Sequence, residues 1–350
     1  MIRTDRDGLR QSIQRQREQL DTSHALLTDS GTHTYTPHEV ILELEGICLR
    51  AFTPQQPNGQ SPLLLCYALV NRPWILDLAP DCSLVNALLA QGFSVYLIDW
   101  GSPSRSQQHL GLEHYIGQLL HQCVLATTTH ANANQVNLIG ICQGGVFSLC
   151  YAALHPERVH RLITLVTPVD FHVEAFTLSK LYRNTNTAQL VAAYGNIPGE
   201  LVTQMFTALE PMRQGQFRHL HTHARLNRTR RSAQQFLLME QWLQDCPDLA
   251  GKALQQFVQI FFKDNSLMTG QFRLGRLEVD VGRMNTPVLN IYGKQDHLVP
   301  ADASCALQTL LPAEQYHSLG IRAGHIGTLM SSRALKEVPT AIRDWMESIG

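Results

Sequence analysis

The sequence lacks any long apolar run. No apolar stretch in its 350 residues approaches the length of about 20 needed to cross a bilayer, and the segment Met1-Ile2-Arg3-Thr4-Asp5-Arg6 has no apolar core of a signal peptide. The formal net charge of only −1 gives no reason to expect nucleic acid or a strongly anionic membrane as a partner. Internal repeats and low-complexity tracts are missing too. We therefore expect a globular, cytoplasmic protein that does not bind nucleic acid.

Paired cysteine motifs are also missing. The chain has 8 cysteines, but no C-x-x-C pair, so most of them are predicted to be small buried apolar residues rather than disulfides or metal ligands. The run 218–231 is rich in histidine and arginine, yet no cysteine or carboxylate accompanies it. A solvated basic face is the favoured interpretation, and contact with the phosphates of a nucleotide-bearing substrate is a weaker alternative. We expect neither a metal nor a cofactor.

One cysteine stands in a distinctive local pattern, Gly140-Ile141-Cys142-Gln143-Gly144-Gly145. A buried strand is predicted before it, at 135–139, and a helix after it, at 146–154. This is the context of the nucleophile elbow of an α/β-hydrolase, with cysteine where serine usually stands. The glycines permit a tight turn, and the helix N-terminus favours an anionic thiolate. The alternative is a glycine-rich turn that happens to contain a packed cysteine.

Candidate partners of the nucleophile follow in the order that this fold uses. Asp296 comes just after a predicted strand at 286–293, and His325 lies on a glycine-flanked loop after a later strand. His297 competes for the role of base, but it directly follows the acid and is expected to face the surface or the cap. The candidate catalytic residues are therefore Cys142, Asp296 and His325.

The rest of the pattern predicts an α/β fold, namely an α/β-hydrolase with a mostly parallel sheet and an inserted, largely helical cap. The expected strands are 40–44 and 47–52 (a hairpin through Glu45-Gly46), 62–67, 94–100, 135–139, 161–166 and 286–293, and the expected helices are 83–91, 112–131 and 146–154. We expect an N-terminal peripheral segment at 1–35 with a helix between Arg3 and Leu27. The hydrolase core then spans 36–170 and 283–350, and the cap spans 171–282. A plain helical subdomain with its own core is the alternative to a cap.

Five separated motifs resemble the catalytic subunit of class III polyhydroxyalkanoate synthases, from about residue 40 to the C-terminus. They are Gly140 to Gly145, Tyr67 to Asp77-Leu78, Tyr96 to Gly101, Gly195 to Leu201, and Pro287 to Tyr292 with Asp296 to Pro300. The resemblance implies polymerisation of (R)-3-hydroxyacyl-coenzyme A, as in poly-3-hydroxybutyrate synthesis, with release of coenzyme A.

The resemblance also implies roles for single residues. Cys142 would carry the acyl group as a thioester, His325 would deprotonate it, and Asp296 would orient the imidazole and assist the attacking 3-hydroxyl group. The backbone N–H groups of Gln143 and Val70 would form the oxyanion hole.

Partners and location are likewise implied by the resemblance. Larger synthases of this kind have an extra N-terminal domain that this sequence lacks, which implies a separate accessory synthase subunit docking at the cap or at residues 1–27. A homo- or hetero-oligomer on the polyhydroxyalkanoate granule surface is expected, with the growing polyester chain bound. The alternatives are a cysteine hydrolase or thioesterase of the dienelactone hydrolase type, and a non-catalytic granule scaffold.

Overall fold

A twisted sheet organises the computed structural model, which describes residues 35–209 and 230–349. Its eight strands lie in the order β1-β2-β6-β3-β7-β8-β11-β12. The first two strands pair antiparallel, β2 also pairs antiparallel with β6, and all later neighbours are parallel. The strands are β1 Glu39–Leu44, β2 Ile47–Phe52, β3 Leu63–Cys66, β6 Val95–Asp99, β7 Val136–Ile141, β8 Val159–Leu165, β11 Val288–Gly293 and β12 Tyr316–Ile321.

The parallel strands β3, β6, β7, β8 and β11 are buried on both faces, which explains why they appear in the sequence as continuous apolar runs. The edge strand β12 is partly exposed. Along β3, Leu64 and Cys66 join one core cluster, whereas Leu63 and Leu65 join the other. The first cluster lies under α3 Leu112–His114, the π-helical turn Tyr115–Leu119, α4 Leu120–His130 and α5 Gln143–Leu154. The second lies under α2 Leu84–Leu89, α14 Gly327–Met330 and α15 Ala334–Ser348. The sheet is therefore the middle of three layers.

The N-terminal hairpin forms where the sequence predicts it. Glu45 has φ 52° and Gly46 has φ 90°, and two such positive angles are typical of the tight turn that matches strand twist. This hairpin places β1 at the edge of the sheet.

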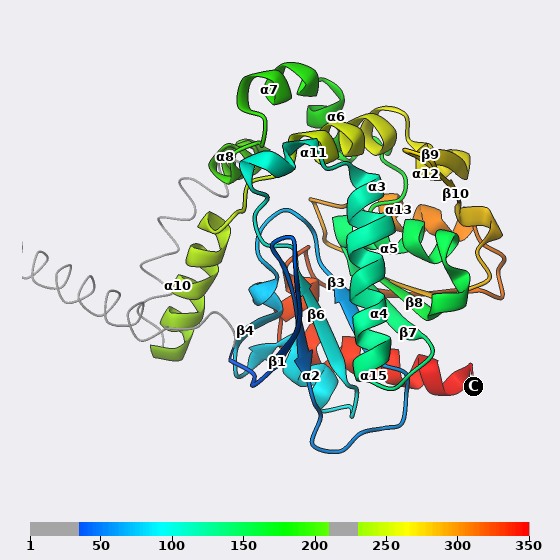
Figure 1. Ribbon diagram of the computed structural model, residues 1–350. Coiled ribbons are helices and arrows are strands. Elements are labelled where there is room, and N and C mark those ends of the chain that lie inside the picture. Colours follow the sequence, from blue (N-terminus) through cyan, green and yellow to red (C-terminus); the bar gives the residue numbers. More distant parts are fainter. Residues whose placement is uncertain (1–34, 210–229, 350) are drawn as a thin grey trace, which may run out of the picture.

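Helices dominate the segment between β8 and β11. They are α6 Thr177–Arg183, α7 Thr187–Tyr194, α8 Gly199–Leu209, α10 Arg230–Gln244, α11 Gly251–Phe257 with the π-helical turn Val258–Lys263, and α12 Ser266–Thr269. Helices α6, α7, α8 and α11 gather above the sheet, and α10 runs down along one side (Figure 1). None of the strands described between β8 and β11 joins the main sheet. The fold class predicted from the sequence is thus the one observed, while the exact domain bounds stay a prediction.

Some details of this segment differ from expectation. The strands β9 Gln271–Leu274 and β10 Leu277–Asp280 form a small antiparallel hairpin that the helical pattern did not predict. Its buried residues Leu274 and Val279 pack into the first core cluster, so tertiary contacts stabilise strands too short to be recognised alone. Helix α5 also begins at Gln143 rather than at 146. Its first turn contains glycines, which close packing requires and which helix propensity alone would not place there.

Two predicted features fall largely outside the described residues. The helix expected between Arg3 and Leu27 lies wholly outside them, and so does the basic run 218–231 apart from Arg230 and Arg231, which begin α10. Within the described parts of the chain, no helix is both long enough and apolar enough to cross a membrane.

Candidate active site

Cys142 occupies a strained turn between β7 and α5. Its backbone angles are φ 54° and ψ −121°, a region that non-glycine residues enter only when the surroundings enforce it. Two hydrogen bonds do so here: its N–H donates to the carbonyl oxygen of Leu165 at 2.9 Å, and its own carbonyl oxygen accepts from the N–H of Gly145 at 3.0 Å. The thiol is therefore held at the carboxyl end of a central strand and at the start of a helix.

The glycines around Cys142 are sterically required. A Cβ atom at Gly144 would collide with the carbonyl oxygens of Cys66 and Tyr67, and one at Gly140 would collide with Gly145 and Ser148. Helix α5 consequently approaches the neighbouring strand ends closely enough to bring Cys142 beside the loop after β3.

His325 and Asp296 meet beside Cys142. Nδ1 of His325 donates to Oδ2 of Asp296 at 2.7 Å, and the side chains are 11% and 0% exposed. The other carboxylate oxygen accepts from the backbone N–H groups of Leu298 and Val299, both at 2.9 Å. The anchored carboxylate of Asp296 fixes the imidazole of His325 through Nδ1. The second ring nitrogen, Nε2, is then left for the hydrogen bond with the Cys142 thiol.

Electrostatics favour a protonated imidazole at this position. Burial by itself lowers the pKa of His325, but the negative charges of Asp296 and of the Cys142 thiolate, with hydrogen bonds to both, outweigh burial and raise the pKa from 6.5 to about 10. A protonated His325 thus lies between the carboxylate of Asp296 and the sulfur of Cys142.

We expect this raised pKa to make stability depend on pH. The folded protein holds the His325 proton more tightly than the unfolded chain, whose imidazole pKa is about 6.5. The resulting stabilisation is fully present below pH 6.5 and is lost as the pH rises to about 10. Urea unfolding between pH 6.5 and 10 should therefore show a steeper decline in the free energy of unfolding for the wild type than for His325→Gln. Parallel declines in the two proteins would contradict the ion pair.

His297 is placed differently from His325. Its side chain is exposed and lies on the wall of the same cavity, whereas the carboxylate of Asp296 is bonded to His325. Of the two histidines that the sequence offered, the structure brings His325 into contact with both the acid and the thiol.

The loop after β3 lies opposite the elbow. The N–H of Leu69 donates to Oε1 of Gln143 at 2.9 Å, so this amide is not free to bind a ligand. The next residue, Val70, lines the cavity with Cys142 and Gln143. Within the described part of the chain, no hydrogen bond uses the N–H of Val70. Val70 and Gln143 thus stay the candidates for an oxyanion hole.

A large cavity opens over these residues. Its volume is about 1130 Å³, and its wall includes Cys142, Asp296 and His325. The opposite wall comes from the segment between β8 and β11 and is mostly aromatic and aliphatic, with Phe171, Phe176, Leu178, Tyr182, Phe206, Trp242, Leu254, Phe257 and Phe262. The site is thus roofed by apolar side chains of the predicted cap.

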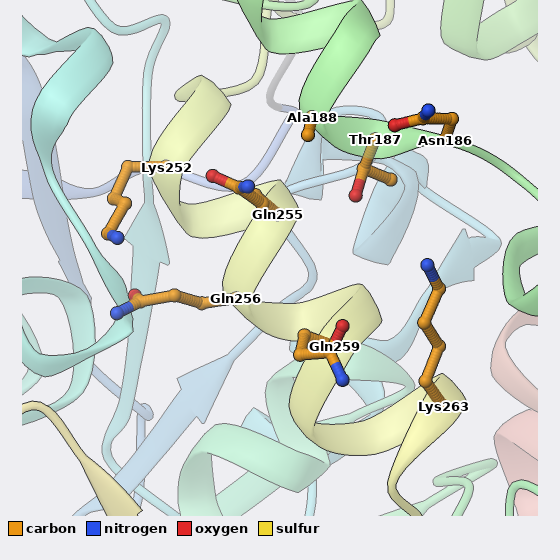
Figure 2. Close-up of a pocket in the computed structure, with 8 residues that line it drawn as sticks. All are labelled: Asn186, Thr187, Ala188, Lys252, Gln255, Gln256, Gln259 and Lys263. Carbon is orange, nitrogen blue, oxygen red and sulfur yellow. The ribbon is translucent and has the colours of Figure 1, made fainter.

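A second, smaller pocket lies away from these catalytic candidates. Its volume is about 280 Å³, and mostly polar residues from the start of α7, from α11 and from the π-helical turn Val258–Lys263 line it (Figure 2). Lys252 and Lys263 lie at opposite ends of this pocket (Figure 2), and at the rise of a helix they are on the order of 15 Å apart. No candidate catalytic residue lines the pocket.

The sheet order, the elbow and the acid–histidine pair at the carboxyl ends of the strands define an α/β-hydrolase with a cysteine at the nucleophile position. In agreement, the alpha/beta hydrolase fold family matches residues 61–327. A monoacylglycerol lipase structure from Paleococcus ferrophilus shares the fold, with a TM-score of 0.52, 16% identity, and coverage of 86% of this chain and 99% of the lipase.

Within this class the chain belongs to the PhaC subunit family of poly(3-hydroxyalkanoate) polymerases. It is 43% identical over 313 residues to the poly(3-hydroxyalkanoate) polymerase subunit PhaC of Thiocystis violacea, covering 89% of this chain and 88% of that protein. The PhaC subunit of Allochromatium vinosum is 43% identical over 291 residues, which are 83% of this chain and 82% of that protein. The resemblance found in the sequence motifs is confirmed at the level of the family.

One side chain at the site, that of Trp242, was not assigned a role from the sequence. Trp242 falls within the predicted cap at 171–282, for which the sequence gave no residue roles, yet it lines the cavity and bonds to the loop that carries Val70. Nothing in the local pattern of α10 separates it from its apolar neighbours, because its partner is 170 positions away in the chain.

Proposed function

We propose that this chain is the catalytic subunit of a poly(3-hydroxyalkanoate) polymerase that transfers (R)-3-hydroxyacyl groups from coenzyme A to a growing polyester. The observation that carries the proposal is the continuous contact from Cys142 through His325 to the anchored carboxylate of Asp296, on the wall of a large cavity. The names of its relatives supply the substrate class.

Acylation uses this contact directly. His325 takes the thiol proton, and the sulfur of Cys142 attacks the thioester carbonyl carbon. The carbonyl oxygen becomes an oxyanion that the N–H groups of Val70 and Gln143 are placed to stabilise. The carbon–sulfur bond to coenzyme A then breaks, and the departing thiolate takes the proton from His325. A new thioester on Cys142 replaces the old one.

Elongation follows from the reactivity of that thioester. The 3-hydroxyl group of the next 3-hydroxyacyl-coenzyme A attacks the thioester carbonyl carbon, its proton passes to His325, and an oxygen ester forms as the bond to Cys142 breaks. The freed sulfur of Cys142 then attacks the coenzyme A thioester of the lengthened chain, and coenzyme A leaves as in acylation. A serine would hold the acyl group as a less reactive oxygen ester, so cysteine suits repeated transfer. Asp296 is the second group that can assist the attacking hydroxyl, since it contacts the same imidazole.

The cavity fits this substrate in size and polarity. Its volume of about 1130 Å³ exceeds the usual range for small-molecule sites, about 300 to 1,000 Å³. The aromatic roof, which includes Phe171 and Phe262, favours an apolar acyl chain and limits water, which would otherwise hydrolyse the thioester.

One assay tests the proposal against a hydrolase, a thioesterase or an inert scaffold. The protein is incubated with 3-hydroxybutyryl-coenzyme A, and released thiol and polymer mass are followed together. We expect both to rise in proportion. Thiol release with free 3-hydroxybutyrate and no polymer would indicate a hydrolase, and no release at all would indicate a scaffold.

We further propose that an accessory synthase subunit activates this chain, forming a hetero-oligomer. The relatives are themselves named subunits, and an apolar cap over Cys142 would limit substrate entry unless a partner shifts the population towards an open form. We expect slow polymerisation with a lag from the chain alone, and a faster, lag-free reaction when a class III accessory subunit is added. Deleting residues 1–27 should lower this stimulation more than the basal rate. A full rate without lag and without response to the partner would refute the dependence.

Association with the granule surface follows from the same chemistry. The polyester product is insoluble and returns to Cys142 as a thioester in each cycle, so an active chain is repeatedly tethered to its product. Co-sedimentation with polymer granules tests this. Recovery of active protein only in the supernatant would contradict it.

A further inference from the structure

The C-terminal end of α10 is fastened to the loop after β3. Nε1 of Trp242 donates a 2.7 Å hydrogen bond to the carbonyl oxygen of Arg72, and the carbonyl oxygen of Trp242 accepts from Nδ2 of Asn71 at 3.4 Å. Just after the helix, Asp245 accepts from Nε1 of Trp74 at 2.8 Å and lies 3.5 Å from Nε of Arg72. The predicted cap and the loop after β3 are therefore joined by hydrogen bonds and one ion pair.

The two indole rings in these contacts are shielded from water, whereas Arg72 and Asp245 are partly exposed. Trp242 is 3% exposed and Trp74 is 5% exposed, and both belong to the second core cluster. A hydrogen bond in such surroundings is stronger than one at the surface, and losing its donor leaves a carbonyl oxygen without a partner. The Trp242 contact therefore restrains the position of Arg72.

The backbone beside this contact is in an uncommon conformation. Asn71 has φ 61°, in the left-handed region that L-residues rarely occupy without help. Its N–H donates to the thiol of Cys246, the residue that follows Asp245. Planar peptide groups leave only φ and ψ free at each residue. Val70 lies between Leu69, whose N–H is bonded to Gln143, and the restrained residues Asn71 and Arg72, so anchors on both sides limit the directions in which its N–H can point.

We propose that Trp242 is a positioning residue, whose indole hydrogen bond to Arg72 holds the loop so that the Val70 N–H points at the oxyanion formed on the thioester. The inference rests on the proposed function, in which that N–H acts during acylation. Because this hydrogen bond links α10 to the loop, a displacement of α10 changes the geometry of the oxyanion hole. The cap and the catalytic step are thereby coupled.

The variant Trp242→Phe tests the proposal because it keeps an aromatic ring and removes only the N–H donor and part of the indole. Trp345→Phe is a matched control: Trp345 lies in the same core cluster, and its Nε1 has no hydrogen-bond partner among the described residues. Both variants are first checked for an unchanged circular dichroism spectrum and melting temperature.

Two reactions of Cys142 are then compared. Release of coenzyme A passes through an oxyanion, whereas alkylation by iodoacetamide is a displacement that forms none. We expect Trp242→Phe to lower kcat for release by about ten- to a hundredfold, since a misplacement of about 1 Å can cost about 100-fold. KM and the alkylation rate of Trp242→Phe should stay near the wild-type values. Trp345→Phe should resemble the wild type in kcat, in KM and in the alkylation rate.

A second variant keeps the test decisive if Trp242→Phe is unstable. Asp245→Asn retains an acceptor for Trp74 but removes the charge that faces Arg72, and we expect a smaller fall in kcat, again without loss of alkylation. Equal losses of release and alkylation in either variant would assign it a structural role and overturn the proposal, as would a Trp242→Phe enzyme with full kcat. A wild type that is alkylated normally but releases no coenzyme A would instead refute the proposed function.

Discussion

Replacing Cys142 by alanine is expected to abolish release of coenzyme A from 3-hydroxybutyryl-coenzyme A. Removing the nucleophile of a catalytic triad can cost about 10⁶-fold in kcat, so we expect a fall on the order of 10⁴-fold or more, to the limit of detection. The fold should persist, because the strained backbone at this position is set by the hydrogen bonds to Leu165 and Gly145, which involve main-chain atoms alone. Thiol release is measured with a chromogenic disulfide, and folding by circular dichroism.

Cys305→Ala is the matched control for this variant. Cys305 ends α13 Ala301–Cys305 and is also partly exposed, but it does not line the cavity. It should keep wild-type activity, whereas Cys142→Ser should retain at most a trace, since serine is a poorer nucleophile here and forms the less reactive ester. Substantial release by Cys142→Ala would overturn the mechanism, and peptide mapping would then identify the thiol that carries the acyl group.

Replacing His325 and replacing Asp296 are expected to differ in kind. His325→Gln removes the group that accepts the thiol proton, so acylation should fall by about 10²- to 10⁴-fold, the usual contribution of a general base. Asp296→Asn should permit slow acylation but impair elongation. Its amide oxygen can still accept from Leu298 and Val299, and its NH₂ group would then face Nδ1 of His325 and favour the wrong imidazole tautomer.

A labelled 3-hydroxybutyryl group separates the two steps. We expect the label to stay bound to Cys142 in Asp296→Asn, with little polymer formed, and to be nearly absent from Cys142 in His325→Gln. Rapid-quench measurements of bound label and of chain length give both rates. Equal loss of acylation and elongation in the two variants would count against separate roles for the acid and the base.

Much of the site could be predicted from the sequence, because its signals are local or follow chain order. The elbow is a contiguous run around Cys142 whose glycines are needed for close approach, and such short patterns survive without tertiary information. Asp296 follows a recognisable strand. Three histidines follow Asp296 in the chain, at 297, 317 and 325, and the glycine-flanked loop favoured His325 as the base.

Other parts could not be predicted, because they depend on residues far apart in the chain. The helical pattern of residues 171–282 gave no sign of the β9–β10 hairpin, whose apolar side chains find partners only in the assembled core. The role inferred for Trp242 has no local sequence signal at all, since apolar side chains on a helix face look alike until the packing is known.

The sequence by itself determined the order of strands and helices, the strained cysteine turn and the family, since apolar periodicity, glycine placement and motif order are properties of the chain. Only the tertiary structure decided that His325 is the histidine in contact with Asp296. It also decided that Gln143 accepts from the Leu69 N–H and leaves that of Val70, and that Trp242 of the predicted cap is bonded to the same loop. The physical reason is that hydrogen bonds and apolar packing are short-range. A contact within about 4 Å is fixed by how elements distant in sequence pack together, and chain order does not specify it.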